Sequence, residues 1–369
     1  MMRIRAIDLH LVAMPLVRPF RTSMGTSTEK QMILARVRTD EAEGWGECVA
    51  DITPDFSAEF NEGAWLVIRD HLAPALFAAG EVSAEDLASV FAGVRGNPMA
   101  KGTLVNAVLD AQLRARIESL ASYLGAARER VECGVSVGIT PTTEELMEQV
   151  RGYLGEGYRR IKLKIEPGLD RERVAAVRHG HPGILLSVDA NAAYTLEDAD
   201  VFHDLDRFDL LMVEQPLHHE DLVRHAELQR RIRTDLCLDE SIRSAADAAA
   251  AIQLGACRIV NIKQGRVGGV LQARAVHDVC RAAGVPVWCG GMLETGIGRA
   301  TNLALAAMPG FTLPGDTSAS SRYFHEDLTE AFVLAPDGTM AVPDGPGIGV
   351  TPDADRLAAW TLRTERLTP

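Results

Sequence analysis

Residues 161–165 read Ile161-Lys162-Leu163-Lys164-Ile165, a short apolar run that carries two lysines. Side chains two residues apart point to the same face of a β-strand, so both lysines would leave this strand in one direction. Seven further apolar runs occur in the same part of the chain, and segments with helical periodicity separate them. The eight runs are Cys133–Val137, Ile161–Ile165, Ile184–Val188, Leu210–Val213, Leu236–Leu238, Arg258–Ile262, Val285–Trp288 and Phe311–Leu313.

Continuous apolar strands that alternate with helices indicate parallel strands buried on both faces. Eight such units in roughly 190 residues are typical of a TIM-type (β/α)₈ barrel. The pattern alone also permits an open, doubly wound sheet, which it fits less well. We therefore predict an α/β protein in which residues 128–325 form a modified (β/α)₈ barrel.

Residues 1–127 have a different pattern, with strands first and helices afterwards, which indicates an α+β unit. Asn97-Pro98 predicts an N-cap followed by proline at the first position of a long helix. We expect this unit to cap the barrel and the Pro/Gly-rich residues 326–369 to fold back on it. Three segments predict an antiparallel meander at its start: Ile7–Leu11, Ile33–Arg38 and Glu43–Glu47.

The composition excludes several classes of protein. The chain of 369 residues has 51 acidic and 38 basic side chains, a formal charge of −13, and no Lys/Arg-rich run. Binding to nucleic acid or to an anionic membrane is therefore not expected. The six cysteines are scattered without a Cys-x-x-Cys pair, as in reduced proteins. Met1–Arg5 lacks the apolar stretch of a signal peptide and no run reaches membrane-spanning length, so we expect a cytoplasmic protein.

Five charged residues recur at the ends of successive runs. Lys164, Asp189, Glu214, Asp239 and Lys263 are 25, 25, 25 and 24 residues apart, which is one βα unit per step. Each therefore occupies the carboxyl end of its strand, where barrel enzymes place their active sites. The spacing predicts that these five side chains surround one barrel mouth.

The three carboxylates of this set have no Cys or His partner, and hard oxygen ligands select Mg²⁺, or Mn²⁺ in its place, over zinc or copper. A purely structural role is the alternative, because acidic residues at strand ends also cap helices and pair with lysines. That alternative is disfavoured for five residues in register, since uncompensated carboxylates converging on one mouth would repel one another.

The charge balance suggests removal of a proton α to a carboxylate. Three carboxylates, one divalent ion and a substrate carboxylate have a net charge of −2. Formation of an enolate places further negative charge on the oxygens of the substrate carboxylate. The ion and a protonated Lys162 would stabilise that charge. A lysine that acts as base must be neutral, and burial beside other cations favours the neutral amine of Lys164. Lys263 has Arg266 three residues further on as a cationic neighbour.

Several motifs resemble the enolase superfamily, its muconate-lactonizing-enzyme subgroup and, within it, the branch of N-acylamino acid racemases and o-succinylbenzoate synthases. The strings that carry this resemblance are Lys162-Leu163-Lys164, Val188-Asp189-Ala190-Asn191, Glu214-Gln215-Pro216, Asp239-Glu240-Ser241, Lys263-Gln264-Gly265-Arg266, Cys133-Gly134-Val135-Ser136, Gly290-Gly291-Met292-Leu293-Glu294 and Gly315-Asp316-Thr317-Ser318. Gln264 departs from the branch, where proline is expected.

The resemblance implies a role for each residue. Asp189, Glu214 and Asp239 would bind Mg²⁺, Lys164 and Lys263 would be the acid/base pair, and Lys162 would stabilise the enolate. Glu240 and Arg266 would support them from behind. Pro19–Gly25 would be a loop that closes over the substrate, although Phe20 alone fits core packing equally well. The residues expected to contact the substrate are Ser136, Asn191, Phe20, Met24, Gly291, Met292 and Leu293.

The favoured activity is racemisation of N-acylated amino acids, N-succinyl derivatives above all, by proton transfer through an enolate. The alternative is o-succinylbenzoate synthase, a dehydratase of menaquinone biosynthesis that needs the same enolate, and one site can support both. A non-catalytic barrel that only binds is disfavoured because all five strand-end residues are present. We expect a small carboxylate substrate as partner and a homo-oligomeric assembly.

Overall fold

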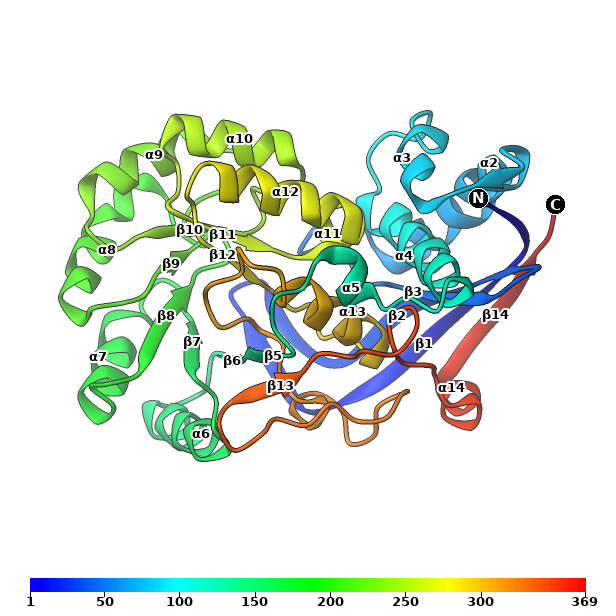
Figure 1. Ribbon diagram of the computed structural model, residues 1–369. Coiled ribbons are helices and arrows are strands. Elements are labelled where there is room, and N and C mark those ends of the chain that lie inside the picture. Colours follow the sequence, from blue (N-terminus) through cyan, green and yellow to red (C-terminus); the bar gives the residue numbers. More distant parts are fainter.

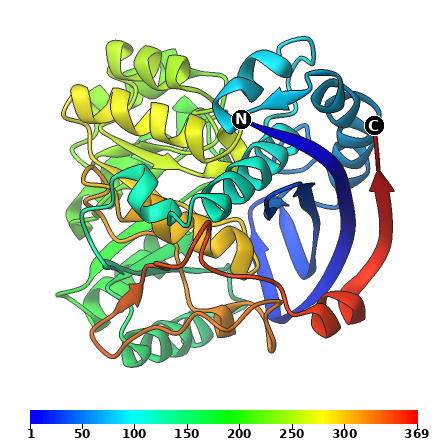
Figure 2. The same cartoon turned by 45° about the vertical axis from the view of Figure 1, so that its right-hand side comes forward.

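An antiparallel sheet built from both ends of the chain flanks a ring of parallel strands (Figure 1). The computed structural model describes residues 1–369. Strands β1 (Met2–Thr22), β2 (Gly25–Thr39) and β3 (Glu43–Cys48) form the predicted meander, which is confirmed. Strand β14 (Thr361–Leu367) pairs antiparallel with β1, and Figure 2 shows the two strands side by side. The short β4 (Glu81–Val82) also pairs with β1.

Two glycines of β3 allow a long helix to lie directly on this sheet. A Cβ atom at Gly44 or at Gly46 would overlap the backbone of helix α4, so larger residues would force the layers apart. The helices of this unit, which include a short π-helical turn between α1 and α2, are α1 (Asn61–Val67), α2 (Ala73–Ala78), α3 (Leu87–Val90), α4 (Pro98–Ala115) and α5 (Leu120–Leu124).

The predicted cap of helix α4 is wrong in one respect. Pro98 is the first helical residue, as expected, but the preceding Asn97 has a left-handed backbone (φ 52°) and its side chain makes no cap hydrogen bond. Glu59 takes that role instead, because its carboxylate accepts hydrogen bonds from the backbone N–H of Met99 (2.7 Å) and Ala100 (3.1 Å). A carboxylate at this position also complements the helix dipole.

Seven parallel strands form the second sheet, in the order β12-β11-β10-β9-β8-β7-β6. The helices that connect them cover its outer face, which confirms the predicted modified TIM barrel (Figure 1). The units are β6 (Gly134–Val137), α6 (Thr143–Glu156), β7 (Arg160–Lys164), α7 (Arg171–Gly180), β8 (Leu185–Asp189), α8 (Ala199–Leu205), β9 (Val213–Glu214), α9 (Leu222–Arg231), β10 (Leu236–Leu238), α10 (Ala245–Leu254), β11 (Ile259–Ile262), α11 (Gln264–Val267), α12 (Val270–Ala282), β12 (Val287–Cys289) and α13 (Gly296–Ala306).

The eighth predicted strand, residues 311–313, is not a strand, which corrects the sequence prediction. Single bridges join Phe311 to Val287 of β12 and Gly315 to Cys133 beside β6. Pro314 interrupts the segment and has no backbone N–H for a ladder. The segment nevertheless closes the ring between β12 and β6. Strands β7 and β11 therefore stand four places apart in a ring of eight, on opposite sides of the barrel.

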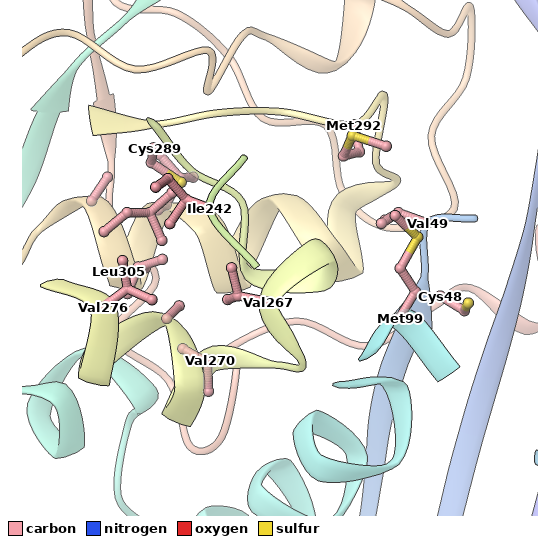
Figure 3. Close-up of a cluster of buried hydrophobic side chains, with 14 of the residues drawn as sticks. Cys48, Val49, Met99, Ile242, Val267, Val270, Val276, Cys289, Met292 and Leu305 are labelled. Carbon is pink, nitrogen blue, oxygen red and sulfur yellow. The ribbon is translucent and has the colours of Figure 1, made fainter. Parts of the chain in front are cut away.

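The two parts share one hydrophobic core, in which 98 buried residues form a continuous cluster. Figure 3 shows Val49 and Met99 from the N-terminal part together with Val267 from the barrel. The tail contributes β13 (Thr339–Ala341), which pairs with β5 (Arg130–Glu132), and α14 (Ala354–Trp360), which leads into β14. The exact domain boundaries at residues 127 and 325 stay a prediction. None of the helices combines the length and the apolar character needed to cross a bilayer.

One buried carboxylate joins the three strands at the edge of the antiparallel sheet. Asp8 on β1 accepts hydrogen bonds from Arg36 (2.8 Å) and Arg38 (2.8 Å) on β2 and from Arg366 (2.6 Å) on β14. Burial raises the pKa of this carboxyl, but the arginines, Arg366 first, hold the pKa of Asp8 well below its usual range. This cluster ties the C-terminal strand to the N-terminal strand.

Asp8→Asn is expected to lower the melting temperature by about 3 °C or more at pH 7, because three arginines lose their common counter-ion. A depressed pKa means that this stabilisation is complete above about pH 4 and is lost as the pH falls further, so the difference between the proteins should shrink there. Thermal unfolding at several pH values measures it. Asp40→Asn is the control, because the Arg5–Asp40 pair is exposed and should contribute little. Equal effects of both substitutions would contradict the prediction.

Candidate active site

The barrel brings the five strand-end residues to one mouth. Lys164, Asp189 and Glu214 are the last residues of β7, β8 and β9, and Asp239 and Lys263 follow β10 and β11 directly. The five strands are consecutive neighbours in the sheet, so the three carboxylates lie between the two lysines. Because β7 and β11 stand opposite one another in the ring, the two lysines approach the mouth from opposite sides.

Each of these two lysines contacts an acidic neighbour. The Lys164 Nζ atom lies 2.6 Å from Asp189 Oδ2 and donates to Asn191 Oδ1 at 2.6 Å. The Lys263 Nζ atom lies 2.9 Å from Asp239 Oδ2. Both lysine side chains are more than nine-tenths buried. Little water reaches these two amino groups, so their nearest polar neighbours are the carboxylates of Asp189 and Asp239.

Lys162 lies deeper in the barrel than Lys164, on the same face of β7. Its ammonium is 2.9 Å from Glu214, 3.2 Å from Asp189 and 2.8 Å from Asp316. Burial lowers the pKa of this ammonium, but the surrounding carboxylates, Asp316 first, raise the pKa well above its ordinary value. Lys162 is therefore a fixed positive charge beneath the mouth.

The three carboxylates suit a divalent cation. Neither carboxylate oxygen of Asp239 has a hydrogen bond of normal geometry, although Lys263 and Arg266 lie beside it. Burial, and then the charge of Asp189, raise the pKa of Glu214, so a cation among these groups would relieve an unfavourable arrangement of charge. Hard carboxylate oxygens without thiol or imidazole select Mg²⁺ or Mn²⁺. The donor chemistry therefore suits a divalent metal ion, although the three side chains do not form a ready cluster of ligands here.

Lys164 and Lys263 line a cavity of about 520 Å³ between the antiparallel sheet and the barrel mouth. The hairpin that joins β1 to β2 forms one wall, and the loop after β12 forms another. Phe56 adds an aromatic face, with its ring centre 4.6 Å from Lys263 Nζ. Six of the residues predicted to contact substrate line this cavity: Phe20, Met24, Asn191, Gly291, Met292 and Leu293.

Ser136, the seventh predicted contact, does not line the cavity. It is buried in β6 beside Lys162, and its hydroxyl has no hydrogen-bond partner. Phe56, by contrast, was missed by the sequence reasoning. It lies in an irregular stretch without periodicity, so only the fold reveals that it faces Lys263.

A second cavity of about 1190 Å³, which Phe56 also lines, lies between α3 and α4 of the N-terminal part and α11 and α12 of the barrel. Glu240 and Arg266 line it, but Lys162, Lys164, Lys263 and the three strand-end carboxylates do not. Of these two cavities, the smaller one is the cavity that both Lys164 and Lys263 line.

Glu240 and Arg266, the two residues predicted to assist the site, contact residues of the mouth. Glu240 accepts a hydrogen bond from Asn191 Nδ2 at 2.8 Å. Arg266 donates to the backbone carbonyls of Ile242 (3.0 Å) and Asn261 (2.9 Å) and contacts Asp239. Burial lowers the pKa of Arg266 to about 9. Arg266 thus faces the carboxylate that Lys263 also contacts.

Two charged residues of the barrel interior were not proposed as site residues from the sequence. Arg160 lies two residues before Lys162 and points to the same interior, so the alternation that selected the lysines applies to it as well. Asp316 contacts both Lys162 and Arg160 from the segment that closes the ring. Asp316 stands in the string Gly315-Asp316-Thr317-Ser318 that carries the family resemblance, but its segment is not a regular strand, so no strand pattern showed that it faces Lys162.

Known protein families match most of the chain. Residues 6–125 match the family described as "Mandelate racemase / muconate lactonizing enzyme, N-terminal domain", and residues 145–356 match "Enolase C-terminal domain-like". The chain belongs to the mandelate racemase / muconate lactonizing enzyme family. The resemblance to the enolase superfamily is thereby confirmed, and enzymes of this family generally depend on a divalent metal ion.

Individual members of the family are similar over almost the whole chain. N-succinylamino acid racemase of Amycolatopsis is 57% identical over 96% of this chain and 97% of its own length. The o-succinylbenzoate synthase of Geobacillus stearothermophilus is 46% identical over 97% and 96%, respectively. A solved enolase-superfamily structure from Listeria innocua has a TM-score of 0.96 at 40% identity and covers 100% of both chains. These relatives confirm the racemase and synthase branch.

Proposed function

We propose that this enzyme racemises N-acylamino acids, with N-succinylamino acids as its preferred substrates. One observation carries the proposal: two buried lysines approach one cavity from opposite sides of the barrel, with three carboxylates between them. Inversion at a carbon atom requires a proton to leave one face and another to arrive at the opposite face. The 57% identity to an N-succinylamino acid racemase supports the same choice.

Asp189, Glu214 and Asp239 would hold a divalent ion, for which we propose Mg²⁺, with Mn²⁺ as a substitute. When bound, the ion supplies a fixed positive charge beside the substrate carboxylate. Lys162 adds a second positive charge from below, where its contacts to Glu214 and Asp316 hold it in place. Negative charge that develops on the carboxylate oxygens is thus stabilised without reorganisation of water.

The proton transfers fall to the two lysines at the mouth. The neutral amine of one lysine removes the α-proton, and the ammonium of the other donates a proton to the opposite face, which gives the mirror-image amino acid. Phe20, Met24 and Phe56 supply apolar surface to the cavity, so they would keep water away from the carbanionic carbon. Reversal of the two roles performs the reaction in the other direction.

A second candidate activity is o-succinylbenzoate synthesis, the name carried by the Geobacillus relative that is 46% identical. A syn-dehydration loses a proton and a hydroxyl group from the same face. Lys164 alone could remove the proton and then protonate the leaving hydroxyl group. The site therefore suits both reactions, since both begin with the same proton abstraction.

Rates with both substrates test this proposal. Purified enzyme with Mg²⁺ is expected to racemise a single enantiomer of an N-succinylamino acid and, in D₂O, to introduce deuterium at the α-carbon. Polarimetry and proton NMR measure the two processes. The o-succinylbenzoate precursor serves as the competing substrate, and kcat/KM ranks the two activities. Strong dehydration without measurable racemisation would reverse the ranking.

We also propose a homo-oligomeric, cytoplasmic enzyme. All six cysteines are buried free thiols, as is common in a reducing compartment. Light scattering of the purified protein would test the oligomeric state.

A further inference from the structure

Three cations point into the barrel from one strand. Arg160, Lys162 and Lys164 alternate along β7, so their side chains form a column from the buried interior to the mouth. Lys164 reaches the cavity, whereas Arg160 has no exposed surface. Nothing in the proton transfer uses Arg160. A fully buried guanidinium is costly unless it is paired, so its retention needs an explanation.

Asp316 connects the two lower cations of this column. One oxygen, Oδ2, lies 2.8 Å from Lys162 Nζ, and the other, Oδ1, accepts from Arg160 at 2.5 Å. The carboxylate is more than nine-tenths buried. Burial raises its pKa, but Lys162 and then Arg160 hold the pKa of Asp316 well below its usual range. Asp316 is thus a buried carboxylate anion shared by both cations.

Arg160 is itself fixed on several sides. It donates to the carbonyl of Pro314 at 2.9 Å, and its guanidinium lies 4.7 Å from the ring centre of Trp288. A Cβ atom at Gly134 would lie 2.7 Å from the guanidinium, so this glycine leaves the space that Arg160 needs. The backbone N–H of Asp316 donates to Cys289 at 2.8 Å. Both ends of the Arg160–Asp316 pair are therefore anchored in the barrel wall.

The Lys162 ammonium has three N–H donors and three carboxylate neighbours, which are Asp189, Glu214 and Asp316. Two of these neighbours belong to the proposed metal-binding set. Asp316 is the one that keeps its oxygens for Lys162 and Arg160 alone. A lysine on a flexible four-carbon stem stays in one position only if such a partner holds it.

We propose that Asp316 is a positioning residue that fixes the Lys162 ammonium beneath the reacting carboxylate, and that Arg160 fixes Asp316. The inference rests on the proposed function, since it assigns Lys162 a role in stabilising the enolate. It holds for racemisation and dehydration alike, because both pass through that enolate. A charge that is already in place when the enolate forms costs no reorganisation during the reaction.

Asp316→Asn is expected to lower kcat about 100-fold and to change KM less than about threefold, because the misplaced charge matters mainly in the transition state. Asp110→Asn is the matched control. Asp110 is equally buried and pairs with Arg114 at 3.0 Å, but it lies on α4 outside the catalytic cavity. Both variants should lose thermal stability, and only Asp316→Asn should lose kcat.

A double-mutant cycle with Lys162→Ala separates positioning from a general structural effect. In the Lys162→Ala background, Asp316→Asn should change kcat less than about threefold, because no ammonium remains to be positioned. If the fold-loss of kcat in the double variant equals the product of the two single fold-losses, the inference is overturned. Normal kcat in Asp316→Asn would also overturn it. A crystal structure of that variant should show the Lys162 Nζ atom displaced. Lys162→Ala with normal kcat would instead contradict the proposed function itself.

Arg160→Lys provides a second route if Asp316→Asn does not fold. It keeps the positive charge but removes the stacking on Trp288 and the fork that joins Asp316 to Pro314. We expect kcat to fall about tenfold in the wild-type background and to stay the same in the Lys162→Ala background. Equal losses in both backgrounds would contradict a role that acts through Lys162.

Discussion

Asp239→Asn is expected to lower kcat/KM by about 10³-fold or more, since the three carboxylates would no longer hold a divalent ion tightly. Both oxygens of Asp239 are buried, and they contact Lys263 and Arg266 without a hydrogen bond of normal geometry. Calorimetric titration of the metal-free protein with Mg²⁺ should show weaker binding by the variant. Excess chelator should abolish the activity of the wild-type enzyme, and added Mg²⁺ should restore it.

Asp235→Asn is the control for that experiment. Asp235 precedes β10 and pairs with Arg258 at the surface, whereas Asp239 follows the same strand at its other end. The control should keep kcat/KM within about twofold of the wild type. Melting temperatures of both variants show whether lost activity merely reflects unfolding. Full turnover in chelator, or by Asp239→Asn, would contradict the metal assignment.

The strand ends were predictable because a parallel barrel repeats one unit. A residue at the same place in successive βα units reaches the same mouth, so the regular spacing of Lys164, Asp189, Glu214, Asp239 and Lys263 already specified the centre of the site. The antiparallel meander was also predictable, because apolar and charged side chains alternate from Ala35 to Arg38. In both cases local pattern and global fold agree.

Features that depend on contacts between distant segments were not predictable. The local motif Asn97-Pro98 correctly gave the start of α4, but the side chain that caps the helix is Glu59, 40 residues away. The prediction of an eighth strand was wrong because residues 311–315 make only single bridges to their two neighbours and no regular ladder. Asp316 contacts Lys162 only once its segment closes the ring, and Phe56 contacts Lys263 only once the N-terminal part packs on the barrel. In irregular backbone the sequence has no regular period, so it does not predict which way a side chain points.

The two lysines at the mouth should be separable by isotope exchange. By resemblance to the racemase branch, Lys164 would serve the S enantiomer and Lys263 the R enantiomer. In D₂O, Lys263→Ala should still exchange the α-proton of the S substrate, because Lys164 remains on that face. Racemisation should fall by about 10³- to 10⁴-fold, because no acid remains on the other face. Lys164→Ala should show the same behaviour with the R substrate. Proton NMR follows exchange, and polarimetry follows inversion.

The geometry makes this separation possible. Lys164 and Lys263 belong to strands on opposite sides of the ring and contact different carboxylates, Asp189 and Asp239. Removal of one lysine therefore leaves the partner of the other intact. Loss of both exchange reactions in either variant would show that the lysines do not act as independent bases.

Dehydration offers an internal comparison, because it needs only one face of the substrate. Lys263→Arg keeps the positive charge beside Asp239, so it should retain most dehydration activity while racemisation disappears. If dehydration disappears as well, Lys263 has a role in that reaction beyond its charge, and Lys164 alone does not suffice as acid and base.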